Sequence, residues 1–144
     1  MKPVHVLGVL IAVGVIAAPI AMARPPYRLQ AITQLGLTPD LDGKATITCQ
    51  YCHAGPRGGK PWNAFGDNVV ANFFGAAEKN IAQALYLTMK DRKDSDGDGY
   101  DDVLEVIADT RPGDAKSVPK TPEDTLEAQL KIWGGVDYFK PKPQ

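Results

Sequence analysis

The sequence predicts a mainly α-helical domain, and two observations support this fold class. Apolar residues recur three or four positions apart in several stretches, and glycines stand where most of those stretches end. The chain shows none of the strand and helix alternation that marks a βαβ unit. We therefore expect a small helical domain.

The first 23 residues have the features of a secretory signal peptide. Lys2 precedes an apolar stretch from Val4 to Ile20, and Ala21-Met22-Ala23 has the small-x-small pattern that signal peptidase cleaves. A membrane anchor is the alternative, but about 17 apolar-biased residues, with Pro3 just before them and His5 and Pro19 among them, are marginal for spanning roughly 30 Å. We expect residues 1–23 to be removed, and the protein to be periplasmic, secreted or at the cell surface.

The mature chain, residues 24–144, has the length of one domain. Removal of Lys2 from the 16 basic residues leaves 15 against 17 acidic ones, a net charge of −2, and there is no long basic run. Nucleic acid is therefore not an expected partner. No membrane span is expected once the signal is removed.

A short helix is predicted at the start of the mature chain. Arg24-Pro25-Pro26 is expected to be an extended lead-in, because consecutive prolines do not continue a helix. Leu29, Ile32 and Leu35 then follow at near-helical spacing, and Gly36 stands where a helix commonly ends.

The most specific chemical motif follows at Cys49-Gln-Tyr-Cys52-His53. This is the Cys-x-x-Cys-His signature of covalent haem attachment, in which both thiols bond the vinyl groups of one porphyrin and the histidine ligates the iron. A zinc site is a poorer fit, since it needs about four ligands and the mature chain has only these two cysteines and one histidine. A redox dithiol or a plain Cys49–Cys52 disulfide is the other alternative.

On these five residues the chain resembles the c-type cytochromes. The resemblance implies a small cytochrome c-like helical domain around one haem c, and haem attachment outside the cytoplasm, in keeping with the predicted signal. It also implies electron transfer with redox partner proteins rather than catalysis. In the commonest small cytochromes c the haem motif directly follows the N-terminal helix, whereas residues 38–48 here form an intervening loop with turn signals.

A glycine- and proline-rich loop, residues 54–61, follows the haem motif and is expected to pass close to the porphyrin. Arg57, Lys60 and Trp62 are candidate donors to the haem propionates. The next residues, Asn63-Ala-Phe65-Gly66, are similar to a pattern in secreted bacterial proteins and temptin-like extracellular domains, which combine Cys-x-x-Cys-His with an acidic loop.

Met89 is the predicted second axial ligand of the haem iron. An apolar helical face is expected after Gly66, and a stronger helix is expected over residues 76–90, with Ile81, Leu85 and Met89 on one side. Met89 is the only methionine of the mature chain, and His/Met ligation is common in c-type cytochromes. A core role for Met89, with an open or otherwise ligated sixth position, is the alternative.

Residues 94–105 match the template of an EF-hand calcium loop. Carboxylates that converge within a dozen residues repel one another unless a hard cation neutralises them. The predicted ligands are Asp94, Asp96, Asp98, the carbonyl of Tyr100, Asp102 and Glu105.

No second full loop exists to pair with this one. The loop therefore resembles solitary calcium sites of the thrombospondin type 3 or dockerin kind, which implies a structural Ca²⁺ of weak affinity. A C-terminal helix is predicted over about 122–133, with Thr121 as its N-cap and Leu126, Leu130 and Trp133 on one face.

The sequence thus predicts an exported monohaem c-type cytochrome that carries electrons and is stabilised by calcium. Two alternatives stay open. One is a haem-based sensor or small-ligand binder with an open sixth position. The other is a non-haem extracellular calcium-binding module in which Cys49 and Cys52 form a disulfide.

Overall fold

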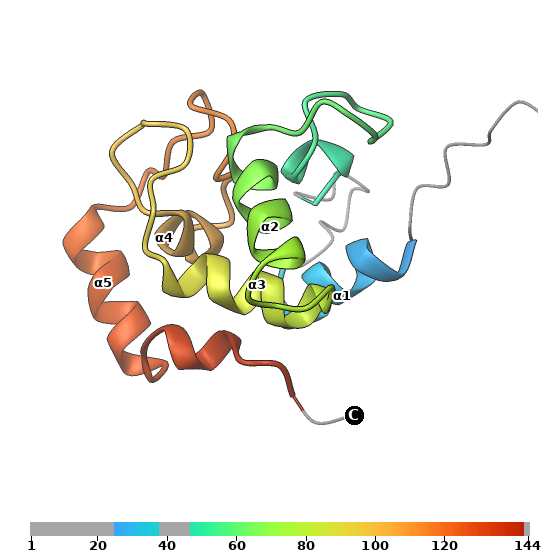
Figure 1. Cartoon of the computed structure of the whole chain (residues 1–144). Coiled ribbons are helices and arrows are strands. Elements are labelled where there is room, and N and C mark those ends of the chain that lie inside the picture. Colours follow the sequence, from blue (N-terminus) through green and yellow to red (C-terminus); the bar gives the residue numbers. More distant parts are fainter. Residues whose placement is uncertain (1–24, 38–46, 143–144) are drawn as a thin grey trace, which may run out of the picture.

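The computed structural model describes residues 25–37 and 47–142, which form a mainly α-helical molecule, as predicted (Figure 1). In chain order its elements are α1 (Pro25–Leu35), the 3₁₀ turn η1 (Cys49–Tyr51), α2 (Ala64–Phe74), α3 (Ile81–Lys90), α4 (Asp102–Ile107), α5 (Glu123–Ile132) and the 3₁₀ turn η2 (Gly135–Phe139). No strand forms within the two described ranges, where a single antiparallel bridge joins His53 to Trp62. The predicted signal peptide, residues 1–23, lies outside the described residues.

Helices α2 and α3 pack against each other at the centre of the molecule (Figure 1). Helix α1 packs against α3, while α4 connects α3 to α5, and η2 folds back from α5 onto α3. Helix α5 packs mainly on α4, and next on η2.

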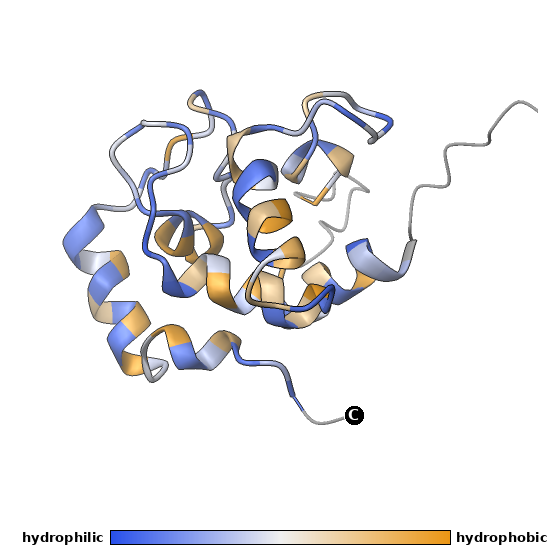
Figure 2. Ribbon diagram, in the orientation of Figure 1, coloured by the Kyte–Doolittle hydropathy of each residue, from blue (hydrophilic) through white to orange (hydrophobic). Residues whose placement is uncertain are grey.

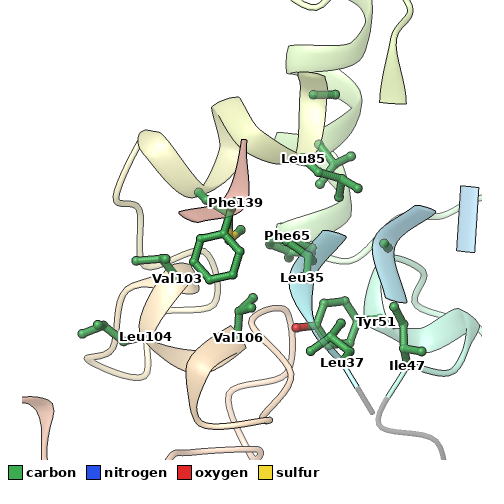
Figure 3. Close-up of a cluster of buried hydrophobic side chains, with 14 of the residues drawn as sticks. Leu35, Leu37, Ile47, Tyr51, Phe65, Leu85, Val103, Leu104, Val106 and Phe139 are labelled. Carbon is green, nitrogen blue, oxygen red and sulfur yellow. The ribbon is translucent and has the colours of Figure 1, made fainter. Parts of the chain in front are cut away.

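One cluster of buried side chains fills the space between the helices (Figure 3). It draws on almost every element, with Leu35 from α1, Phe65 from α2, Leu85 from α3, Val103 from α4 and Phe139 from η2. Each fully buried side chain of this size contributes about 1.5–3 kcal/mol relative to an exposed one. The core therefore holds the central helices and the C-terminal segment together.

Two helices differ in extent from the sequence prediction. Helix α1 begins at Pro25 rather than after the prolines, since the first turn of a helix needs no donor N–H groups. Helix α3 begins only at Ile81, because Glu78 and Lys79 have φ values of 49° and 66°. These left-handed residues form a turn, after which Asn80 caps the helix.

The segment between α3 and α4 is almost entirely hydrophilic, whereas hydrophobic residues concentrate on the facing sides of the helices (Figure 2). In the part of the chain that the structure describes, no helix is long and apolar enough to cross a membrane. The two functional motifs of the sequence lie in the η1 turn and in this hydrophilic segment.

Candidate functional site

The predicted haem-attachment residues share one turn of backbone. Thr48 caps this turn, since its hydroxyl oxygen accepts a hydrogen bond from the N–H of Gln50 at 3.2 Å. The carbonyl of Cys49 accepts hydrogen bonds from the N–H groups of Cys52 at 3.3 Å and His53 at 3.0 Å. The backbone of one turn therefore carries all three residues; the Cys49 and His53 side chains both lie near Gly58, while Cys52 packs against the core.

The imidazole of His53 is oriented by the loop that follows it. Its Nδ1 lies 2.6 Å from the carbonyl oxygen of Gly59, and since a carbonyl only accepts, Nδ1 carries the proton. The unprotonated Nε2 is left for a metal, the arrangement found in most metal-ligating histidines. Trp62 stacks on the ring with 4.2 Å between centroids, and an N–H from Ala54 to the Pro61 carbonyl closes the loop.

The two cysteines are unbridged and partly exposed. Burial raises the pKa of the Cys52 thiol to about 12, and the neighbouring Cys49 thiol adds to the shift. A thiol held in its protonated form at neutral pH is a poor redox nucleophile. At Gly58 an added Cβ would lie 3.7 Å from both the Cys49 Sγ and the His53 Cδ2, so the glycine keeps side-chain atoms away from this face.

An open hollow of about 820 Å³ lies next to Trp62, the residue that stacks on His53, but Cys49, Cys52 and His53 do not line it. Its lining residues are Lys60, Pro61, Trp62, Asp67, Val70 and Phe74. Phe74 is 68% exposed, an unusual state for a large apolar side chain on a helix that also packs into the core. The outward face of α2 thus gives the hollow an apolar wall.

Met89 is not part of this lining. Its side chain is fully buried in the core cluster, on the helix that packs against the other side of α2. Iron ligation by Met89 therefore requires the porphyrin to reach the core side of α2, and it stays a prediction.

The predicted calcium loop brings three of its carboxylates together. Ligand oxygens of Asp94, Asp96 and Asp98 all lie within 4.8 Å of one another. Asp94 also shapes the loop, because its two oxygens accept hydrogen bonds from the N–H groups of Gly97 at 2.8 Å and Gly99 at 2.9 Å. The loop is thus folded around its acidic side chains.

Several carboxylate oxygens here are buried without a hydrogen-bond partner, namely Asp96 Oδ2, Asp98 Oδ2 and Glu105 Oε2. Desolvation, followed by the charges of Asp96 and Asp98, raises the pKa of Glu105 to about 9. Buried polar atoms are nearly always paired, so three unpaired oxygens in one loop fit a cation that would bind them. The charges of Asp96 and Asp98 therefore act on Glu105, although its carboxylate is not in the group of three aspartates whose oxygens lie within 4.8 Å of one another.

The other two predicted ligands have different surroundings. Asp102 is fully buried, and its carboxylate accepts hydrogen bonds from the Ser95 N–H at 2.9 Å and the Ser95 hydroxyl at 2.6 Å. Both of its oxygens are thus engaged within the loop. Tyr100 donates its N–H to Asp98 Oδ1 at 2.9 Å, which leaves its carbonyl as the predicted ligand group.

Comparison of the chain with protein-family models, curated proteins and solved structures finds no match.

Sequence reasoning missed the role of Asn63. Its Nδ2 donates hydrogen bonds to the carbonyls of Gln50 at 2.8 Å and Tyr51 at 3.1 Å, and its Oδ1 caps α2 by accepting from the Gly66 N–H at 2.8 Å. A Cβ on Gly66 would lie 1.8 Å from the Cys52 carbonyl oxygen. The Asn-x-Phe-Gly pattern was visible in the sequence, but only the structure shows that it supports the haem-attachment turn.

Proposed function

We propose that this chain is an exported monohaem c-type cytochrome that transfers electrons between redox partner proteins and carries a structural Ca²⁺. The observation that carries the proposal is the hydrogen bond from His53 Nδ1 to the Gly59 carbonyl, on the same turn as two free thiols. This bond fixes the tautomer that a proximal ligand needs.

In this proposal each residue of the turn has a separate task. Cys49 and Cys52 would hold the porphyrin through thioether bonds, and His53 Nε2 would bind the iron, whose one-electron redox change is the chemistry that haem supplies. The Gly59 carbonyl keeps the imidazole oriented. Trp62 and the exposed Phe74 offer apolar surface to a flat ligand.

Covalent haem content is the decisive test. The full-length chain would be expressed in a host with a c-type maturation system, and the pyridine haemochrome spectrum of the purified protein recorded. We expect one haem c per wild-type chain and loss of the two-thioether product in Cys49→Ala and Cys52→Ala. Gly55→Ala is a suitable control, since a Cβ there meets no atom within 4 Å.

Wild-type protein without covalent haem would contradict the cytochrome proposal. The non-haem calcium module with a Cys49–Cys52 disulfide would then be favoured, and mass spectrometry without reductant would detect the bridge.

A haem-based sensor or ligand binder is the second candidate, favoured by the complete burial of Met89 in the core cluster. It requires an open sixth position. A high-spin ferric spectrum and carbon monoxide binding by the reduced protein would support it, whereas a low-spin spectrum and no binding would support the electron carrier.

A further inference from the structure

The haem-attachment turn is held by one carboxamide. Asn63 donates from Nδ2 to the carbonyls of Gln50 and Tyr51, and its backbone N–H donates to the Cys52 carbonyl at 3.1 Å. Three consecutive carbonyls of the turn therefore depend on the position of one residue. A shift of Asn63 would release the backbone between the two cysteines.

A segment from the far side of the calcium loop covers this carboxamide. A Cβ built on Gly113 would lie 2.5 Å from Asn63 Cγ and 2.6 Å from its Nδ2 and Oδ1. The φ angle of Gly113 is not in the left-handed region, so the glycine is required by space rather than by backbone strain. The backbone at Gly113 lies directly against the Asn63 side chain and holds it in place.

The next residue lies beside the calcium loop. The backbone of Asp114 is close enough to the Asp96 carboxylate to act on it electrostatically, while its N–H donates to the Arg111 carbonyl at 3.1 Å. The segment is itself closed by the Arg111 to Asp114 ion pair at 2.6 Å and by a hydrogen bond from the Arg111 N–H to the Ser117 hydroxyl at 3.0 Å. It is therefore short and internally braced, and it lies between Asn63 and Asp96.

A second connection runs along α2, the helix that Asn63 caps. Asn68 donates from Nδ2 to the Ser95 hydroxyl at 2.7 Å and accepts from the Lys93 Nζ at 3.1 Å. The Ser95 hydroxyl in turn donates to the buried Asp102. Helix α2 is thus tied to the loop one turn after Asn63.

A third contact comes from the haem turn itself. Tyr51 is 1% exposed, packs edge-on against Phe65 at 5.6 Å and has a hydroxyl without a hydrogen-bond partner. Figure 3 shows this hydroxyl directed toward the side of the core where Val106 of α4 lies. The carboxylates of Asp102 and Glu105, on the same helix, are near enough to act on it electrostatically.

We infer that Asn63 is a positioning residue for the haem-attachment turn, and that Gly113 and Asp114 connect Asn63 to the calcium loop. A cation bound in the loop would therefore fix the backbone of residues 49–53. The inference rests on the proposed calcium site and, for its consequence, on the proposed haem. In physical terms, a bound ion would fix the Asp96 carboxylate and the Asp114 backbone beside it. Gly113, the preceding residue, would then hold the Asn63 side chain in place.

Amide hydrogen exchange tests the link, read by mass spectrometry on the full chain as purified from the maturation host. Exchange would be compared in excess Ca²⁺ and in excess chelator at constant ionic strength. We expect chelation to speed exchange in residues 49–53 by about 10-fold or more, and by clearly less in α3. In Gly113→Ala, exchange in residues 49–53 should already be fast with Ca²⁺ present, while Ca²⁺ affinity measured by calorimetry stays within about 3-fold of wild type.

Two variants serve as checks. Gly55→Ala adds the same methyl group in open space and should behave as wild type. Asn63→Asp keeps the oxygen that caps α2 but loses the two N–H donors, so it should reproduce the fast exchange of residues 49–53 even if Gly113→Ala fails to fold.

The outcomes separate the claims. Ca²⁺ binding without any change in residues 49–53, or an equal change throughout α3, would overturn the link. An absence of Ca²⁺ binding would overturn the calcium site together with the link, whereas an absence of haem would overturn the cytochrome proposal and leave the exchange result valid.

Discussion

Single residues around the haem-attachment turn are constrained by space as well as by chemistry. Gly66 is buried under the Cys52 carbonyl, and Gly113 lies against Asn63, so neither position accepts a side chain without movement of backbone or of the carboxamide. Met89 shows the opposite situation. It fills core volume completely, and that packing role is separable by mutation from its predicted role as an iron ligand.

We predict that Met89→Leu removes the methionine-to-iron charge-transfer band of the ferric protein. The same substitution should lower the free energy of unfolding by less than about 1.5 kcal/mol, because leucine conserves the side-chain volume. Met89→Ala should remove the same band and cost about 2–5 kcal/mol, because it leaves a cavity. Absorption spectra and urea titrations measure the two effects. An unchanged spectrum in Met89→Leu would assign the residue to the core alone.

The predicted calcium loop, residues 94–105, is the element that holds several buried carboxylate oxygens without a hydrogen-bond partner. Without a cation, desolvation raises the pKa of Asp102 to about 7 and that of Glu105 to about 9, both well above their ordinary values. A carboxyl group whose pKa is raised by folding stabilises the fold below its unfolded pKa. That contribution is lost as the pH rises through the folded pKa.

In chelator, we therefore expect the free energy of unfolding to fall between about pH 4 and pH 9, the window set by the unfolded and folded pKa values of these groups. With Ca²⁺ the trend should reverse, because the ion binds the ionised carboxylates in competition with protons. Urea titrations at several pH values would measure both curves. A chelated protein that gains stability with rising pH would contradict this prediction.

Glu105→Gln provides a matched test of the same argument. It replaces a carboxyl group that must take up a proton on folding at pH 8, so the chelated variant should be more stable than chelated wild type at that pH and less stabilised by Ca²⁺. Glu123→Gln, at an exposed position in the first turn of α5, is the control and should change neither difference by more than about 0.5 kcal/mol.

At the scale of the whole molecule, the calcium loop is part of the core. Helix α4 begins inside the loop and places Val103, Leu104 and Val106 in the buried cluster, where they meet Phe139 from the C-terminal segment. Disorder in the loop would therefore loosen packing at both ends of the described chain. The haem turn reaches the same core through Tyr51 and Phe65.

We predict that chelation lowers the melting temperature of the entire chain in one cooperative transition. At a Ca²⁺ concentration 100 times the dissociation constant the ion contributes about 2.7 kcal/mol. For a domain of this length that corresponds to a shift on the order of 10 °C. Calorimetry with Ca²⁺ and with chelator would measure it, and Mg²⁺ at equal concentration controls for ionic strength. Two separate transitions, only one of them sensitive to Ca²⁺, would show that the loop is an independent module.

Sequence by itself determined the helical fold class and the residues of both motifs, because periodicity and fixed ligand spacing are local properties. Cys49, Cys52 and His53 form one turn, and Asp94, Asp96 and Asp98 converge within one loop, so neither grouping depends on distant contacts. The start of α3 was placed too early because apolar spacing continues through the left-handed turn at Glu78 and Lys79.

Only the tertiary structure decided how the two motifs relate. Asn63 and Gly113 are far apart in the chain, and nothing in their local sequence indicates that one covers the other. The same is true of α5, which packs on α4 rather than on α1. Such contacts arise because all the helices pack around one core, and the partner of each buried surface depends on the shapes of all the others. The spacing of apolar residues along one segment does not contain that information.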